Sequence, residues 1–163
     1  MAVLMPVRGG WPPLPPDPVK VAELSKPSRY SLDRQVGFLL RKASQRHAAI
    51  FFSNMPDELT ATQWAALTKI AEIGDCSQIQ LGRETAMDAA TIKGVIDRLL
   101  RRRLVTSTVD PGDARRRIIS LTDEGRDIVE RNIQAAISIT EATLNGLSEG
   151  ERGMLVELLQ KIS

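Results

Sequence analysis

Residues 77–122 contain the pattern that most constrains the fold, because helix signals and strand signals follow one another there without a gap. Ser77 and Gln80 have the spacing of a capping box, which predicts that a short helix begins after Ser77. A polar turn follows, and Asp88 can then cap a second helix that begins at Ala89. Two helices joined by so short a turn predict a helix-turn-helix.

The hydrophobic period changes after the second of these helices. Residues 104–109 and 118–121 are rich in β-branched side chains, and the turn residues Asp-Pro-Gly-Asp at 110–113 lie between them. We therefore expect a two-stranded hairpin directly after the helix-turn-helix, in the position of a wing.

The excess positive charge of the chain is concentrated in this module. Residues 83–117 contain nine Lys or Arg and five acidic residues, which is a net charge of +4, whereas the whole chain carries only +2. A local cationic surface on an otherwise balanced chain is the pattern expected for binding to a phosphate backbone. The predicted partner is double-stranded DNA.

Composition excludes several other classes of protein. The 163 residues are 42 % hydrophobic, enough for one compact domain, and no apolar run approaches the roughly 18 residues of a membrane span. With one cysteine, Cys76, and one histidine, His47, we expect no disulfide framework, metal site or cofactor. Ser44 lies near His47, but no acid or nucleophile turn accompanies them, so we expect no enzyme. The predicted location is the cytoplasm.

The first 30 residues differ in composition from the rest. They hold seven of the nine prolines and show no hydrophobic period, which predicts an extended or disordered arm. The arm is either a simple tail or a segment that packs on a partner subunit, with Trp11 as an anchor. Residues 31–163 are expected to form one domain, in which residues 59–122 are the winged helix-turn-helix.

Amphipathic helices are predicted on both sides of that module. Ser31 can cap a helix that runs to about residue 54, and Thr60 with Gln63 forms a capping box for a helix that ends near residue 73. The first of these helices carries an apolar stripe of Val36, Leu40, Ala43, His47 and Ile50, and the second carries Trp64, Leu67, Ile70 and Ala71.

Two further helices are predicted after the wing. Thr122 can cap a helix to about Asn145, and Ser148 with Glu151 forms a capping box for the last one. Because the terminal helices are apolar on one side and have no obvious partner within the chain, residues 31–54 and 122–163 are expected to form a dimerisation region.

The second helix of the motif is the expected reader of DNA. Its residues Ile92, Val95, Ile96 and Leu99 should face the core. The opposite face presents Ala90, Thr91, Lys93, Gly94, Asp97 and Arg101. Short side chains near the helix start allow close approach to base edges in the major groove, where threonine and lysine can bind. The run Arg101–Arg103 is either a solvated surface or a set of phosphate contacts.

Two segments resemble the MarR family of winged helix-turn-helix transcriptional regulators. DPGDARRRIISLTDEGR at residues 110–126 is similar to the family's wing and the helix start after it, and LTATQWAALTKI at residues 59–70 is similar to its second helix. The resemblance covers about residues 33–163. It implies a mainly α fold with a small β-hairpin, in the order four helices, two strands and two helices, and a homodimer that binds a pseudo-palindromic operator, most often as a repressor.

The resemblance also implies roles for single residues. Arg115 matches the wing-tip arginine that enters the minor groove, and Arg116 lies beside it. Asp113 matches the wing aspartate that pairs with an arginine, and Arg98 matches an arginine of the DNA-reading helix. Gly94 stands where the family often has arginine. Ala86 and Arg103 stand where it often has glycine, and the site of Arg103 is often left-handed.

The family's effector pocket lies between the dimerisation helices and the DNA-binding lobe. This implies that His47, Arg46 and Trp64 are ligand-binding residues, and that the ligand is a small aromatic acid. The spacing of Arg41, Lys42 and His47 resembles regulators of nicotinate breakdown, which favours a pyridine carboxylate. His47 as a plain core or interface residue stays open.

Two other functions remain as alternatives. Cys76 could make the protein redox-responsive, although it directly precedes a cap, where it can pack against Leu81. The winged helix could also be a protein-interaction module, but such a module does not need the clustered arginines at 115–117.

Overall fold

The protein was analysed as a computed structural model that describes residues 30–163. Of the predicted arm, only its last residue, Tyr30, is among the described residues, and Trp11 lies outside them. Six α-helices, one 3-10 helix and three strands follow one another in the described part of the chain. They are η2 (Leu32–Arg34), α1 (Val36–Asn54), α2 (Ala61–Ile73), β1 (Cys76–Ser77), α3 (Gln78–Glu84), α4 (Ala89–Arg101), β2 (Val105–Asp110), β3 (Asp113–Leu121), α5 (Asp123–Thr143) and α6 (Glu149–Ile162).

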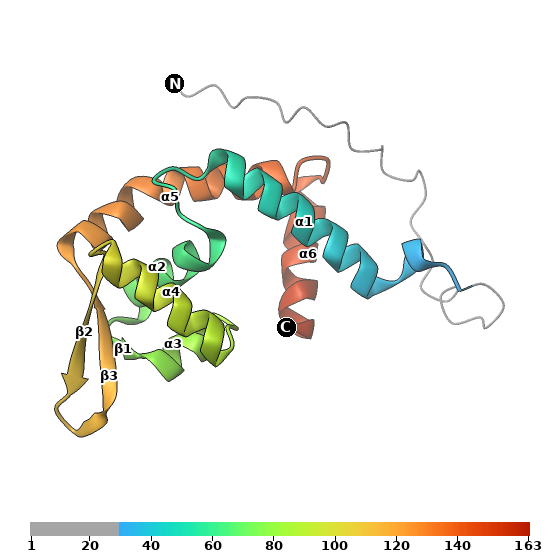
Figure 1. Cartoon of the computed structure of the whole chain (residues 1–163). Coiled ribbons are helices and arrows are strands. Elements are labelled where there is room, and N and C mark those ends of the chain that lie inside the picture. Colours follow the sequence, from blue (N-terminus) through green and yellow to red (C-terminus); the bar gives the residue numbers. More distant parts are fainter. Residues whose placement is uncertain (1–29) are drawn as a thin grey trace.

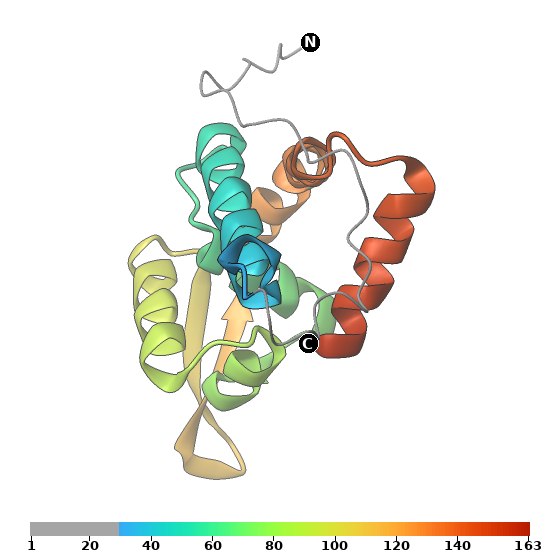
Figure 2. The ribbon, with the colours of Figure 1, turned by 90° about the vertical axis from the view of Figure 1, so that its right-hand side faces the viewer.

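Helices α2, α3 and α4 pack together with a small antiparallel sheet into one lobe, from which the β2–β3 hairpin projects (Figure 1). The strand order is β1-β3-β2, with Ser77 opposite Ile118 and Val105 opposite Leu121. Helix α1 packs along α5, and α5 continues directly from β3 (Figure 2). The mainly helical winged helix-turn-helix expected from the sequence is therefore confirmed.

Most helix starts are where the capping residues predict them. Thr60 and Gln63 form the reciprocal box at α2, and the side chains of Asp88 and Thr122 accept backbone N–H groups at α4 and α5. At α6, the Glu151 carboxylate accepts the backbone N–H of Ser148 at 2.8 Å. These local signals act within one helical turn, so they do not depend on the tertiary fold.

Other boundaries differ from the predictions. Ser31 does not cap the long helix, because it precedes the 3-10 turn and Gln35, with extended backbone, separates that turn from α1. At α3, the Ser77 hydroxyl accepts the N–H of Gln80 at 3.2 Å, but the reciprocal half of the predicted box is not formed. The backbone of Ser77 instead pairs with β3 as part of β1, a two-residue strand too short to predict from a period.

The boundaries of two further elements also differ from the predictions. Helix α5 ends at Thr143, two residues before the predicted end, and β3 begins at Asp113, five residues before the predicted strand. The early part of β3 is the exposed arginine run, which forms a strand by backbone pairing with β2 rather than by burial. On α2, Ala71 is exposed, and Ala66 is buried instead.

One aliphatic core joins the lobe to α1 and α5. Leu67, Leu81, Leu99 and Leu104 are at most 1 % exposed, and Ile139 of α5 and Phe51 of α1 belong to the same cluster. The core therefore runs through both parts as one continuous cluster.

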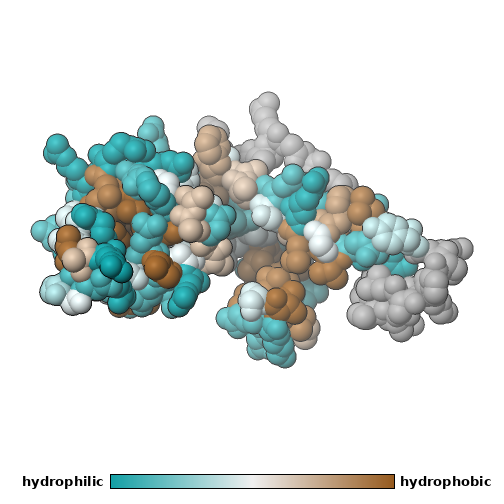
Figure 3. Space-filling model, turned by 60° about the horizontal axis from the view of Figure 1, so that its bottom comes forward, coloured by the Kyte–Doolittle hydropathy of each residue, from teal (hydrophilic) through white to brown (hydrophobic). Residues whose placement is uncertain are grey.

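Helix α6 buries none of its side chains within the chain. Large apolar residues are exposed in groups on α1, α5 and α6, and singly on α2 (Ile73) and α3 (Ile79). The groups are Val36, Leu39, Leu40 and Phe52 on α1, Ile133 and Ile137 on α5, and Met154, Val156, Leu158, Leu159 and Ile162 on α6. Figure 3 shows hydrophobic side chains on the helices beyond the winged lobe as well as on the lobe itself. Within residues 30–163, no helix is both long and apolar enough to span a membrane.

Candidate DNA-binding surface

Helix α4 is held by its apolar face. Ile92, Val95, Ile96 and Leu99 are all at most 3 % exposed, as predicted. The Asp88 carboxylate accepts the N–H of Thr91 at 2.7 Å, and this hydrogen bond lowers the pKa of Asp88, so the cap stays charged at neutral pH. The anchoring of one face leaves the opposite face of α4 free to meet a ligand.

The predicted reading face is open to solvent. Ala90, Thr91, Lys93, Arg98 and Arg101 are exposed and Gly94 is half-buried. A Cβ added at Gly94 would have one close neighbour, the guanidinium of Arg98 at 3.8 Å. That distance is an ordinary van der Waals contact, so the space at this position does not require glycine. The structure brings these six residues together on one surface.

The wing is shaped by two aspartates. The Asp110 carboxylate accepts the N–H of Gly112 at 2.8 Å, and the Asp113 carboxylate accepts the N–H of Arg115 at 2.9 Å. Asp113 was expected to pair with an arginine side chain, but that role belongs to Asp110, whose carboxylate lies 3.8 Å from Nε of Arg116. Asp113 supports the wing through the backbone instead, since its short side chain bonds two residues ahead.

The three wing arginines have different surroundings. Arg117 donates to the hydroxyl and the carbonyl of Ser107 on β2, at 2.8 and 2.9 Å, so it ties the two strands together. Arg116 is loosely paired with Asp110. Among the described residues, the Arg115 guanidinium has no hydrogen bond or ion pair. Arg115 is therefore the wing cation that is available to a partner.

Both helices of the motif end in a left-handed residue that is not glycine. Ala86 has φ 52° and Arg103 has φ 58°. After α3 the N–H of Met87 bonds to Gly82 O, and after α4 the N–H of Leu104 bonds to Leu99 O, as in a Schellman motif. The left-handed conformation expected at Arg103 is thus confirmed. It costs about 1 kcal/mol at a residue with a Cβ.

The start of α5 is docked onto the residues that follow α4. The Thr122 hydroxyl donates to Arg103 O at 2.8 Å, and the Thr122 N–H donates to Leu104 O at 3.1 Å. A Cβ on Gly125 would lie 2.0 Å from Leu104 O, so only glycine fits there. The Leu-Thr-x-x-Gly segment therefore fixes the recognition helix and the wing relative to α5.

The arginine run at the end of α4 is only partly a solvated surface. Arg101 and Arg103 are exposed, but Arg102 donates to the carbonyls of Asp57 and Glu58, at 2.7 and 3.4 Å. Arg102 therefore has an internal role that its position in a charge run does not reveal.

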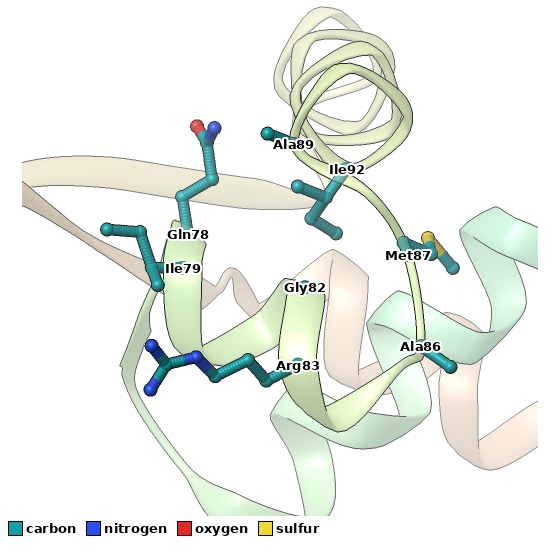
Figure 4. Close-up of a pocket in the computed structure, with 8 residues that line it drawn as sticks. All are labelled: Gln78, Ile79, Gly82, Arg83, Ala86, Met87, Ala89 and Ile92. Carbon is teal, nitrogen blue, oxygen red and sulfur yellow. The ribbon is translucent and has the colours of Figure 1, made fainter. Parts of the chain in front are cut away.

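A hollow of about 420 Å³ lies between α3 and the start of α4 (Figure 4). In Figure 4, Gln78, Ile79 and Arg83 extend from α3, and the Gln78 side chain points toward Ala89 of α4. These three α3 side chains line the hollow and were not among the predicted DNA contacts. A second, polar hollow is lined by Glu58, Gln63, Arg98, Arg101 and Arg102.

Two predicted effector residues connect α1 to the end of α5. His47 Nδ1 lies 2.9 Å from Thr143 Oγ1, and Arg46 donates to Ala142 O at 3.4 Å. The Thr143 hydroxyl already donates to Ile139 O at 2.8 Å, so the proton of the His47 bond belongs to Nδ1. Trp64 is half-buried on α2 and packs against the core.

Cys76 is 2 % exposed within β1, and burial raises the pKa of its thiol. A buried thiol with a raised pKa is a poor nucleophile, because the thiolate is the reactive form. Within residues 30–163, no cluster of three or more His, Cys, Asp or Glu side chains could hold a metal ion.

Comparison with known proteins gives a consistent picture. The MarR family pattern matches residues 59–116. The HTH-type transcriptional repressor NicR of Pseudomonas putida is 42 % identical over 134 residues, which cover 82 % of this chain and 85 % of NicR. A probable transcriptional regulator from Pseudomonas aeruginosa is 48 % identical, with a TM-score of 0.79, over 82 % of this chain and 100 % of that one. BpsR of Bordetella bronchiseptica, whose DNA binding is regulated by 6-hydroxynicotinic acid, is 44 % identical, with a TM-score of 0.75, over 79 % of this chain and 98 % of BpsR.

An anchored helix with an open cationic face, beside an arginine-bearing hairpin, defines a winged helix-turn-helix protein of the DNA-binding class. The similar proteins show which family of this class the chain belongs to. The chain belongs to the MarR family, and it is a DNA-binding transcriptional regulator rather than an enzyme.

Proposed function

We propose that the protein is a ligand-responsive repressor that binds a pseudo-palindromic operator as a homodimer and is released by a small aromatic acid. The residues proposed to contact DNA are Ala90, Thr91, Lys93, Gly94, Arg98, Arg101, Arg115 and Arg116, with Asp113 supporting the wing. The proposed place of action is the cytoplasm, where the DNA is.

The wing cation is the observation that carries this proposal. The Arg115 guanidinium has no hydrogen bond or ion pair among the described residues, whereas the Arg117 guanidinium is bonded inside the hairpin. An exposed guanidinium at a wing tip fits a narrow minor groove, while the open face of α4 fits the adjacent major groove. A protein-interaction module does not require an unpaired wing-tip arginine beside an open cationic helix face.

Homodimerisation is supported by the apolar surface outside the lobe. Exposed residues on α1, α5 and α6, among them Leu39, Ile137 and Leu158, would be buried by a second copy of the chain. We therefore propose residues 31–54 and 122–163 as the dimerisation region and residues 59–122 as the DNA-binding unit. Two recognition helices would then meet half-sites about one helical turn apart.

An aromatic acid as effector is supported by the chemistry around His47. Since Nδ1 carries the proton shared with Thr143, Nε2 of the neutral ring is left as an acceptor. Protonation at Nε2 would make it a donor to a carboxylate, with Arg46 as a second cation and Trp64 as an apolar wall. BpsR responds to 6-hydroxynicotinic acid, which favours a pyridine carboxylate here.

The redox alternative through Cys76 has less support, because its thiol is buried and its pKa is raised. The proposed mechanism is instead a change in the spacing of the two recognition helices, as the effector favours one of two dimer arrangements.

The proposal is tested with the full chain. Sedimentation gives its oligomeric state, and fluorescence anisotropy compares duplexes from its own upstream region with shuffled duplexes at several salt concentrations. We expect a dimer, preference for one duplex, and affinity that falls steeply with salt. 6-Hydroxynicotinic acid should release this duplex from the protein and not from a His47→Ala variant. A monomer, or equal binding to shuffled DNA, would contradict the proposal.

A further inference from the structure

The turn between α1 and α2 has an unusual backbone. Asp57 and Glu58 are consecutive and both left-handed, with φ 57° and 51°. Neither is glycine, and such residues are retained where their surroundings hold them in place. Met55 and Leu59, on either side of the pair, are buried at 8 % and 4 % exposure. The two ends of the turn are thus anchored in the core, and its centre is held in one conformation.

The side chain of Asp57 faces α5. Its two carboxylate oxygens accept from Arg131 at 3.1 and 3.0 Å, which is a bidentate ion pair. Asn132, which is 1 % exposed, donates to the same carboxylate at 2.7 Å. These hydrogen bonds, first that of Arg131 and then that of Asn132, lower the pKa of Asp57. The turn is therefore bound to the middle of α5.

The backbone of the same turn faces α4. Arg102, the C-cap residue of α4, donates to the carbonyls of Asp57 and Glu58. The two left-handed residues are thus the ones whose carbonyls accept from this one guanidinium, whose donors form a fixed fork. One short turn therefore connects the end of the recognition helix to α5 by polar contacts from both its backbone and its side chain.

We propose that residues 55–59 form a clasp that sets the position of the recognition helix relative to the dimerisation region, with Asp57, Arg102 and Arg131 as positioning residues. The inference rests on the proposed homodimer. In a dimer, α5 determines where each lobe sits, so a small change between α4 and α5 alters the distance between the two recognition helices. Binding to one half-site does not depend on that distance, but binding to two half-sites at once does.

The clasp also gives a specific role to an arginine of the 101–103 run. If Arg102 contacts a phosphate, its removal should have a different effect on DNA binding than if it positions the recognition helix. Removal of a phosphate contact lowers the salt dependence of binding by about one counterion, and it weakens binding to every duplex. Removal of a positioning contact leaves the salt dependence unchanged and weakens only the two-site complex.

The test compares an intact operator duplex with one in which a half-site is scrambled, using the full chain. Asp57→Asn keeps the size of the side chain and tolerates the left-handed backbone, but it loses the charge. Arg131→Gln removes the other partner from a half-exposed position. For both variants we expect roughly five- to tenfold weaker binding to the intact operator and unchanged binding to the single half-site. Glu72→Gln, which breaks the exposed Lys69 ion pair on α2, is the matched control and should change neither.

Arg102→Gln should show the same selective loss with an unchanged salt dependence. Equal loss on both duplexes, or no loss on either, would overturn the clasp. The proposed function fails separately, if the unaltered chain is monomeric or does not prefer the intact operator over the single half-site. Melting temperatures recorded for each variant identify a loss that comes from unfolding, and Asp57→Gly, which keeps the left-handed backbone, then replaces Asp57→Asn.

Discussion

The ammonium of Lys93 lies 2.8 Å from Oδ2 of Asp97, one turn further along the recognition helix. Both side chains are exposed, and this hydrogen bond lowers the pKa of Asp97, so the carboxylate is charged at neutral pH. A lysine proposed to contact DNA is therefore paired with an acid on its own helix. On binding, it must exchange that partner for a phosphate or a base.

Asp97→Asn should strengthen binding to DNA. It frees Lys93 and removes a negative charge from a surface that meets phosphates, so we expect affinity to rise about two- to tenfold at moderate salt, for shuffled as well as operator duplexes. Anisotropy titrations measure this. Glu72→Gln removes the same charge from an ion pair on α2 and serves as the control. Weaker binding by the Asp97 variant would show that the pair positions Lys93 rather than restraining it.

Arg115→Ala should weaken operator binding by roughly five- to a hundredfold, the loss expected for one base-reading contact. The hairpin should remain folded, because Asp113 bonds to the backbone N–H of Arg115 and not to its guanidinium. Gel shifts and a thermal melt measure the two effects. Lys69→Ala, on α2, is the control: it removes the same charge from a residue outside both the proposed DNA contacts and the proposed dimerisation region. Unchanged operator affinity would be incompatible with the proposed role of Arg115.

Ala86→Gly should stabilise the protein by about 1 kcal/mol, because glycine adopts the left-handed conformation without the Cβ penalty. Urea denaturation followed by circular dichroism gives the free energy of unfolding. Gly74→Ala should destabilise the protein, by about 1–3 kcal/mol: with φ 80° and ψ −163° its backbone lies in a region open essentially to glycine alone, and no atom lies within 4 Å of an added Cβ, so only the backbone is affected. If Ala86→Gly does not raise the free energy of unfolding, the left-handed backbone at Ala86 does not destabilise the protein.

Gly125→Ala should destabilise the protein by about 2–3 kcal/mol, since the new Cβ would meet Leu104 O at 2.0 Å and push α5 away from the end of α4. Gly153→Ala is the control: it lies within α6, meets nothing within 4 Å, and should gain up to about 1 kcal/mol of helix propensity. Urea denaturation gives the free energy of unfolding of both variants. A Gly125→Ala protein as stable as the unaltered one would mean that the docking of α5 can relax.

Cys76 should react slowly with a thiol reagent in the folded protein at pH 7 to 8. Its pKa is raised, mainly by burial and further by Asp75 and Glu84, so less thiolate is present at a given pH than for a free cysteine. The absorbance released by Ellman's reagent follows the reaction, and the same chain in urea gives the rate for the exposed thiol. Equal rates in both states would restore the redox alternative.

Much of the fold could be predicted because its signals are local. The caps at Thr60, Asp88 and Thr122 act within one turn, and the four apolar residues of α4 follow the helical period. The cationic character of the module and the availability of its wing tip also follow from residues close together in the chain. The helix order, the reading face and the hairpin needed no information about distant contacts.

Other features depended on residues that meet only in the folded chain. The strand at Cys76–Ser77 exists because β3 offers an edge, and Arg102 differs from Arg101 because a turn 45 residues earlier presents its carbonyls. Asp57 carries no motif, yet it joins α5 to the turn that holds α4. Helix capping and periodicity are properties of neighbouring residues, so the sequence alone determined them. The partners of charged and strained residues are set by long-range packing, so only the tertiary structure decided them.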